Sequence, residues 1–321
     1  MAVEATQLPR IDFSGVNPSA PGTGQWAAVR SQVMDALTTV GCFDAHYPAL
    51  APDLRAAFFD GAVRSLFALP IDTKLRNNYG PDKPLFGYLA STPGLSAAYE
   101  SLAISDRVEP ENIRAFADLM WPDGDGGDAG FCETVHGVAK RMAELQEAVQ
   151  RMVMEALGVA KHHDALCEAA RHVFRMSEYK AASGGEAKEK EVRYGAHQDC
   201  STITVVCQHE VAGLEVQTRD GDWILVKPSP ASLVVMAGNE LRALTNDRLH
   251  APFHRVTANR DGARYSAILF TLPKLEIQAP DELVDEEHPP RFKPHYNDDF
   301  MRFCVSQGRR HEDKLTAFCG V

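Results

Sequence analysis

The sequence predicts an α+β fold, with helices in the N-terminal half, a β-rich core and a last helix near the C-terminus. Two observations predict it. Apolar residues recur at helical spacing in the N-terminal half, and from about Val173 the period changes from 3.6 residues to 2. Many short strands separated by turn residues are typical of a sandwich or barrel, and a double-sheet jelly roll is one closed form.

The N-terminal half begins with a strand candidate over residues 9–13 and continues with three helix candidates. Their apolar positions run from Trp26 to Leu37, from Leu54 to Phe67 and from Val135 to Val153. Gly158 stands where the longest of these helices should end, because glycine favours the backbone conformation that closes a helix. We expect the region 1–165 to be mainly helical.

The β-rich region 166–290 is predicted to form the core. Its strand candidates cover residues 203–206, 214–217, 223–226, 233–236 and 265–272. Asp220-Gly221 stands between two of them and is a strong hairpin signal. Ser183 to Lys190 is small and charged, which is typical of a surface loop. The region 291–321 is expected to hold a helix over Asp298 to Ser306 and a tail.

Composition points to a soluble cytoplasmic protein. The net charge of −11 argues against nucleic acid or an anionic membrane as partner, since both attract basic surfaces. The seven cysteines form no CxxC pair, which favours free thiols in a reducing compartment. The opening residues contain no apolar run of a secretory signal, and no pattern resembles a coiled coil, so we expect a monomer.

Three residues are candidates for metal ligands. His197 and Asp199 are two residues apart beside a β-rich run, and alternation along a strand sends such side chains to the same face. His254 lies in a second extended segment and could supply the third ligand. Two histidines and one carboxylate on one face of an octahedral iron leave three positions open for a co-substrate and dioxygen. The His-x-Asp pair alone is a weak signal, because it occurs often by chance.

Arg264 and Ser266 are candidates for binding an anion. Period 2 puts Arg264, Ser266, Ile268 and Phe270 on one face of a strand. An arginine that points into a β-core is costly unless an anion pairs with it, and a guanidinium beside a hydroxyl suits a carboxylate. The alternative is an outward-facing arginine paired with a surface acid such as Asp261.

Together these motifs resemble the plant 2-oxoglutarate/Fe(II)-dependent dioxygenases, which share the isopenicillin-N-synthase-like fold. The shared features are His-x-Asp, the distal histidine in Pro-Phe-His-Arg-Val, and Arg-x-Ser ten residues later. Further similarity covers nearly the whole chain, at residues 8–13, 41–43 and 69–74. Residues 174–179, 213–217, 226–228 and 283–289 resemble most the AOP-like branch, which contains dioxygenases of glucosinolate side chains and other specialised metabolism.

The resemblance implies a double-stranded β-helix, the jelly roll, as the core of an oxidoreductase. It implies that His197, Asp199 and His254 bind Fe(II), and that Arg264, Ser266 and Tyr179 bind the far carboxylate of 2-oxoglutarate. The implied reaction consumes dioxygen and 2-oxoglutarate, releases succinate and hydroxylates a small plant metabolite, with desaturation or dealkylation as variants. Ascorbate is implied as an additive in vitro.

The substrate pocket is expected at the mouth of the barrel. Its candidate residues are aromatic side chains and the residue between two ligands: Phe86, Tyr88, Tyr99, Phe253, Phe270 and Gln198. Gln198 replaces a threonine that is common in the family, so its amide could reach the substrate. For each aromatic residue, packing in the core is the alternative.

Three other functions stay open at this point. The chain could be an oxidase of the same fold that does not consume 2-oxoglutarate, and succinate release would separate the two. It could also be a non-catalytic small-molecule binder, for which intact metal ligands would be unexpected. A structural zinc protein is disfavoured, because an open site with an aspartate and no cysteine suits iron better.

Overall fold

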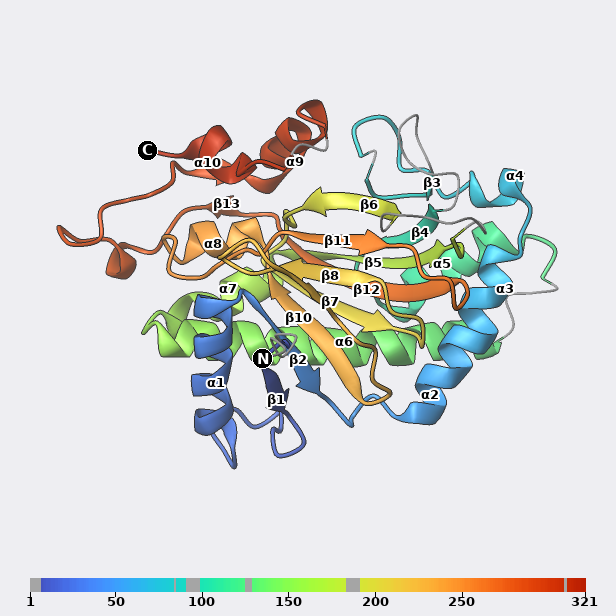
Figure 1. Cartoon of the computed structure of the whole chain (residues 1–321), viewed down its shortest axis with the longest axis horizontal. Coiled ribbons are helices and arrows are strands. Elements are labelled where there is room, and N and C mark those ends of the chain that lie inside the picture. Colours follow the sequence, from blue (N-terminus) through green and yellow to red (C-terminus); the bar gives the residue numbers. More distant parts are fainter. Residues whose placement is uncertain (1–6, 84, 91–98, 125–128, 183–190, 309–310) are drawn as a thin grey trace, which may run out of the picture.

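The computed structural model describes residues 7–83, 85–90, 99–124, 129–182, 191–308 and 311–321. Two β-sheets form its centre and lie on opposite sides of a cavity (Figure 1). In this described part, the larger sheet has eight strands, in the order β1 (Arg10–Asp12), β2 (Cys42–His46), β10 (Ser232–Ala237), β7 (Ile203–Gln208), β12 (Arg264–Pro273), β5 (Ala170–Tyr179), β4 (Tyr99–Asp106) and β3 (Leu89–Ala90). The smaller sheet, counted over the same residues, has four, in the order β6 (Val192–His197), β11 (His254–Thr257), β8 (Leu214–Gln217) and β9 (Trp223–Leu225). The chain therefore has the expected jelly-roll core.

Helices cover the side of the larger sheet that faces away from the cavity. The N-terminal helices are α1 (Trp26–Thr39), α2 (Pro52–Ala56), α3 (Arg64–Phe67), α4 (Ile71–Lys74), α5 (Pro110–Met120), α6 (Ala129–Ala156) and α7 (His163–Glu168), and a π-helical segment over Ala57–Val63 joins α2 to α3. Residues of α1, α5 and α6 share one hydrophobic core with the sheet. The apolar stripe predicted from Val135 to Val153 is buried, which confirms that helix.

The C-terminal elements lie on the opposite side of the sheets from α6 (Figure 1). They are α8 (Asn239–Leu244), the strand pair β13 (Glu276–Ile277) and β14 (His295–Tyr296), α9 (Asn297–Ser306) and α10 (Lys314–Cys319). Two short 3-10 helices, Ala160–His162 and Asp281–Leu283, lie instead at the C-terminal end of α6, where Leu283 packs against Met154 and Val159. The helix predicted over Asp298 to Ser306 is confirmed, whereas the six-residue α10 was expected as tail.

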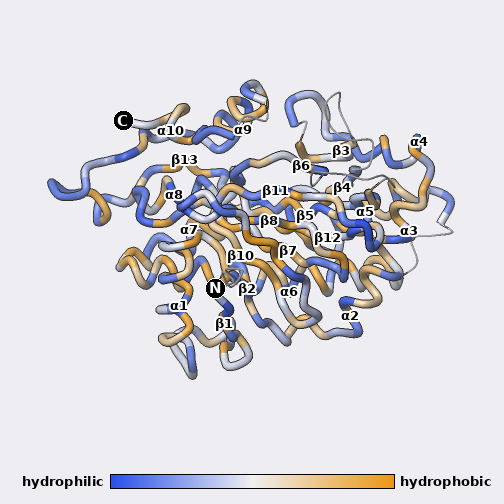
Figure 2. The backbone as a smooth tube through the Cα atoms, in the orientation of Figure 1, coloured by the Kyte–Doolittle hydropathy of each residue, from blue (hydrophilic) through white to orange (hydrophobic). Residues whose placement is uncertain are grey.

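Strand β12 shows how the sheet positions the site. Tyr265, Ala267 and Leu269 point into the core against the helices. Arg264, Ser266, Ile268 and Phe270 line the cavity, as their period-2 spacing predicted. Figure 2 shows hydrophobic residues gathered along the inner strands and α6, with hydrophilic residues on the outer loops. Strands β4, β5, β7, β10 and β12 therefore each turn one face to the hydrophobic core and the other to the cavity.

The predicted strands are confirmed, and the hairpin at Asp220-Gly221 connects β8 to β9. The region 1–165 contributes more strand than expected, because β2 joins the larger sheet next to β1, and β4 and β3 form its other edge. Strand β4 was not predicted, because residues 101–105 are buried on both faces and their sequence shows no alternation of apolar and polar residues. The loop predicted at Ser183 to Lys190 lies outside the described residues. In the described part of the chain, none of the helices combines the length and apolar character needed to cross a membrane.

Candidate metal centre and co-substrate pocket

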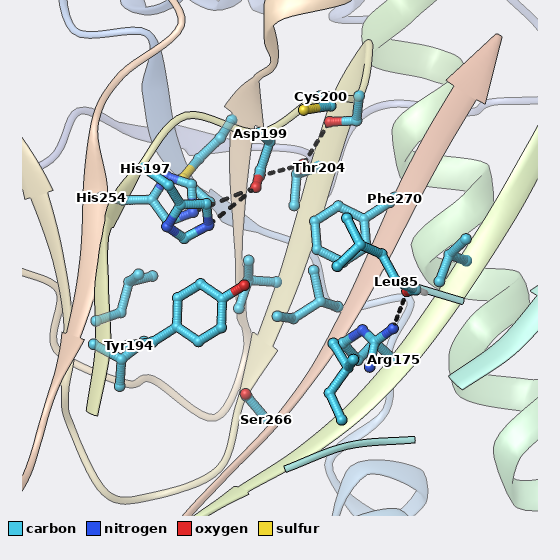
Figure 3. A pocket seen from close by; sticks show the side chains of 18 of the residues that line it. Leu85, Arg175, Tyr194, His197, Asp199, Cys200, Thr204, His254, Ser266 and Phe270 are labelled. Carbon is cyan, nitrogen blue, oxygen red and sulfur yellow. Dashed lines mark hydrogen bonds and ion pairs between the residues drawn. The ribbon is translucent and has the colours of Figure 1, made fainter. Parts of the chain in front are cut away.

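A cavity between the two sheets collects most of the predicted site residues (Figure 3). Strands β4, β5, β7, β10 and β12 contribute from the larger sheet, and β6, β8 and β11 from the smaller one. The predicted residues that line it are His197, Gln198, Asp199, His254, Arg264, Ser266, Tyr179, Phe86, Tyr99 and Phe270. Residues far apart in the sequence therefore meet in one place.

His197, Asp199 and His254 form a compact group. Strands β6 and β11 are antiparallel, and their register places His197 directly opposite His254. Asp199 follows β6 by two residues, and its Oδ1 lies 3.5 Å from Nε2 of each histidine. One potential ligand atom from each residue lies within 4.8 Å of the others, which is close enough to share a metal ion.

Hydrogen bonds orient all three side chains. Nδ1 of His197 lies 3.0 Å from the carbonyl of Gly195, and Nδ1 of His254 lies 3.4 Å from the carbonyl of Pro252. A ring that donates through Nδ1 keeps Nε2 unprotonated, and Nε2 is the atom that faces Asp199. Thr204 on β7 donates its hydroxyl to Oδ2 of Asp199 at 2.6 Å, which leaves Oδ1 toward the histidines.

The protonation states suit metal binding. Burial by itself would raise the pKa of Asp199, but the neighbouring His254 and His197 lower that pKa to about 2. Burial and the adjacent His197 lower the pKa of His254 to about 4. An ionised carboxylate and a neutral imidazole are the forms that bind a divalent cation. The group therefore needs little proton release to accept one.

Arg264 is buried at another place on the same cavity. Its Nη1 donates to the Ser266 hydroxyl at 3.2 Å and its Nη2 donates to Oε1 of Gln208 at 3.0 Å. The guanidinium carbon lies 5.0 Å from the centre of the Tyr179 ring. Burial lowers the pKa of Arg264, and its side chain forms no ion pair within the described residues. A buried cation held by neutral groups fits a carboxylate ligand.

Four of the six residues predicted for the substrate pocket lie on the wall of the cavity. Phe86, Tyr99, Phe270 and Gln198 line the cavity, and Gln198 donates to the carbonyl of Ala251 at 2.7 Å. Apolar side chains from the Leu85 loop, β5, β12 and α9 complete this region.

Two aromatic residues of the prediction do not line the cavity in the described structure. Phe253 precedes the inward-facing His254, so alternation turns it outward, and its ring lies 4.2 Å from that of His311. Tyr88 packs against the helical core and donates its hydroxyl to Glu100 at 2.9 Å. Both residues are therefore corrections to the predicted pocket.

Four polar or aromatic residues at the cavity or beside it were not predicted from the sequence. Thr204 and Gln208 hold Asp199 and Arg264, the Tyr194 ring lies 4.8 Å from that of His197, and Arg175 lines the cavity on β5. A signal existed for Arg175, which stands four residues before Tyr179 and shares its strand face. Thr204 and Gln208 required knowledge of which strands pair.

A jelly-roll core with two histidines, an aspartate and a buried arginine on one cavity is the arrangement of an Fe(II) oxygenase that uses a keto acid. The model of the 2OG-Fe(II) oxygenase superfamily matches residues 170–273. A probable 2-oxoglutarate-dependent dioxygenase, AOP1.2 of Arabidopsis thaliana, is 39% identical over 97% of this chain and 95% of its own length. The chain belongs to the 2OG-Fe(II) oxygenase superfamily, as its motifs predicted.

Solved structures agree with this assignment. The crystal structure of the dioxygenase for auxin oxidation from rice has a TM-score of 0.77 and 31% identity, and the match covers 98% of this chain and all of that one. The corresponding Arabidopsis protein, solved with 2-oxoglutarate, has a TM-score of 0.76 and 25% identity over 88% of this chain and all of its own. The protein is a 2-oxoglutarate-dependent dioxygenase, an oxidoreductase that uses Fe(II), 2-oxoglutarate and dioxygen.

Proposed function

We propose that this dioxygenase hydroxylates a small metabolite in the cavity between its sheets, with Fe(II) held by His197, Asp199 and His254. The observation that carries the proposal is the meeting of these three residues, through strand pairing, at one end of a cavity that also holds Arg264. Succinate is the expected co-product, and desaturation or dealkylation are variants of the same oxidation.

Each residue has a separate task in this proposal. The two Nε2 atoms and Oδ1 of Asp199 would hold the metal, and Arg264 with Ser266 would bind the far carboxylate of 2-oxoglutarate. The Tyr179 ring supports the guanidinium from one face. When bound, Fe(II) and 2-oxoglutarate supply the activation of dioxygen. The apolar wall of the cavity keeps water from the reacting carbon.

The wall also restricts the substrate. Leu85, Phe86, Phe270, Leu272 and Met301 line one region of the cavity, which suits a largely apolar molecule. The names of the rice and Arabidopsis relatives include auxin oxidation. A small plant metabolite of specialised or hormone metabolism is the proposed substrate class.

Conversion of 2-oxoglutarate to succinate tests this proposal. The full-length chain with Fe(II) should release succinate, and His197→Ala or Asp199→Ala should abolish the release. Calorimetry with Mn(II) provides a second measurement that does not depend on turnover. His288→Ala changes an exposed histidine and serves as control. Full succinate release by either ligand variant would overturn the metal assignment.

We also propose a monomer that acts in the cytosol without a nucleic-acid partner. The net charge of −11 and seven free cysteines support this assignment. Size-exclusion chromatography with light scattering tests the oligomeric state. The division of the chain at 165/166 and 290/291 stays a prediction, which limited proteolysis can test.

A further inference from the structure

Arg175 is a second buried guanidinium on the cavity wall, and nothing in the metal or co-substrate sites uses it. We propose that Arg175 binds a carboxylate of the substrate, so that the enzyme oxidises a small carboxylic acid with an apolar body. This inference rests on the proposed function and specifies the substrate of the same cavity.

The contacts of Arg175 involve only neutral acceptors. Nη1 donates to the carbonyl of Gly87 at 3.0 Å and to the hydroxyl of Ser101 at 2.8 Å, and Nη2 donates to the carbonyl of Leu85. A guanidinium has five N–H donors, and these bonds use three. Nε and the second hydrogen of Nη2 are left. These atoms form one edge of the guanidinium, which can bind a carboxylate through two parallel bonds.

Two other buried arginines show that this arrangement is particular to Arg175. Arg171 lies four residues earlier on the same strand, but it pairs with Asp298 and its Cζ lies 4.8 Å from the centre of the Phe86 ring. Arg55 also binds carbonyl groups, yet it lies away from the cavity and holds the chain at Gln208, Pro230 and Ser232. Arg175 alone of the three both faces the cavity and forms no ion pair in the described structure.

The charges of the occupied cavity also favour an anionic substrate. The charged residues among its described lining are Asp199, Arg264 and Arg175. When Fe(II) and 2-oxoglutarate are bound, the two positive charges of the metal balance the two negative charges of the co-substrate, and the charge of Asp199 balances that of Arg264. Arg175 then contributes one uncompensated positive charge in a water-poor space, and a buried charge of that kind is costly. A substrate carboxylate would neutralise it.

Strand register separates Arg175 from the co-substrate. Arg264 pairs with Tyr179, whereas Arg175 pairs with Ile268, four residues along β12. Four residues of strand correspond to roughly 13 Å, so the two guanidinium groups serve different parts of the cavity. Figure 3 shows Arg175 near Leu85 and Phe270, with His197, His254 and Asp199 across the cavity.

The same sheet sets the length of the substrate. Thr204, the partner of Asp199, lies on β7, and β7 and β5 flank β12. Two strand spacings are roughly 10 Å, which is the order of the distance between the metal end and Arg175. An acid of that length could place its carboxylate on Arg175, its apolar body against Phe270 and its oxidised carbon toward the metal.

Matched acids and amides test the proposal by binding. The full-length protein, with Mn(II) and 2-oxoglutarate under anaerobic conditions, is titrated calorimetrically with phenylacetate, 3-phenylpropionate and octanoate, and with the primary amide of each. We expect at least one acid to bind about tenfold to a hundredfold more tightly than its amide, as charge-assisted hydrogen bonds contribute that much. Arg175→Gln should remove the preference, and Arg175→Lys should restore part of it. Arg171→Gln should keep it.

The binding measurements and the melting temperatures together decide the role of Arg175. If no acid binds more tightly than its amide, or if Arg175→Gln keeps the preference while its melting temperature stays near that of the wild type, the proposal is wrong. If Arg175→Gln has a much lower melting temperature than the wild type, the test rests on two other results: the wild type must prefer the acid over its amide, and Arg175→Lys must keep part of that preference. Succinate release by the wild type is measured in parallel. Its absence would contradict the proposed function, whereas succinate release without an acid preference would contradict only the role of Arg175.

Discussion

At the scale of single residues, the metal site depends on side chains that do not touch the metal. Thr204 fixes one oxygen of Asp199, and backbone carbonyls fix the rings of His197 and His254. Gln208 does the same for Arg264. Groups of this kind orient ligands and commonly change metal affinity by about ten- to a hundredfold. The functional site therefore includes residues outside the sequence motifs, which orient the motif residues.

Thr204→Val should weaken metal binding. The variant keeps the shape of the side chain but removes the donor to Oδ2 of Asp199, so the carboxylate loses its fixed orientation. We expect Mn(II) affinity to fall by about tenfold or more in calorimetry. Thr202→Val is the matched control, because the Thr202 hydroxyl binds the carbonyl of Thr271 instead. Equal affinity in the two variants would remove Thr204 from the metal site.

Gln208→Met should raise the KM for 2-oxoglutarate with little change in kcat. The substitution removes the acceptor for Nη2 of Arg264 and leaves a side chain of similar length. Bonds to charged groups contribute about 1.5–3 kcal/mol, so we expect KM to rise by about tenfold or more. Steady-state succinate release measures both constants. A fall in kcat at unchanged KM would mean that Gln208 does not act through Arg264.

At the scale of elements, alternation explains what the sequence could predict. Arg264 and Ser266 line the cavity as their spacing predicted, because β12 keeps period 2 throughout. Phe253 was assigned wrongly because the same rule, applied from His254, turns it away from the cavity. Strand β4 has no readable period, since residues 101–105 are buried on both faces. Thr204 and Gln208 reach the site through pairing of β7 with β12, and one sequence does not reveal which strands pair.

Gly213, at the entrance to β8, should tolerate no side chain. A Cβ at Gly213 would lie 2.7 Å from the carbonyl oxygen of Thr257 and 2.9 Å from Cδ of Arg264. Gly213→Ala should therefore displace Arg264 and raise the KM for 2-oxoglutarate severalfold, measured by succinate release. Gly61→Ala is the control, because its Cβ would meet no atom within 4 Å. An unchanged KM in Gly213→Ala would show that the chain relaxes away from Arg264.

At the scale of the whole molecule, a buried polar cluster fastens the C-terminal segment to the core. Glu240 on α8 accepts from Asn297 at 2.7 Å, and its other oxygen lies 2.9 Å from Nε2 of His295. Burial by itself would lower the pKa of His295, but hydrogen bonds with Cys319 and Glu240 raise it to about 10. The helix α9 that follows carries Met301 into the cavity. The way the C-terminal segment folds therefore affects the shape of the pocket, because Met301 forms part of its wall.

His295→Gln should destabilise the protein most at mildly acid pH. A raised pKa means that the ion pair contributes fully below the unfolded pKa of about 6.5 and is lost as pH rises toward 10. We expect a deficit of about 3 kcal/mol in the free energy of unfolding at pH 6, shrinking toward pH 10. Urea denaturation across that range measures it, with exposed His288→Gln as control. A deficit that does not vary with pH would contradict the ion pair.

Metal and co-substrate together should stabilise the folded chain. Their proposed ligands come from both sheets, so they bind a site that exists only when the sheets are assembled. At concentrations about a hundredfold above Kd, binding adds about 2.7 kcal/mol, and the melting temperature should rise by roughly 5 °C. Anaerobic thermal melting with Mn(II) and 2-oxoglutarate measures the rise. Asp199→Ala should show none, and a full rise in that variant would place the ligands elsewhere.

The two-faced strands of the larger sheet have a consequence for divergence among related enzymes. On β5 and β12, residues that pack against the helical core alternate with residues that line the cavity. Val173, Phe270 and Leu272 pack together on the cavity side, in a cluster separate from the helical core, so their shapes can change together while the residues that pack against the helices stay as they are. A change of substrate specificity therefore requires substitutions only at every second position of these strands. Both natural selection and protein engineering can make such substitutions with little loss of folding stability.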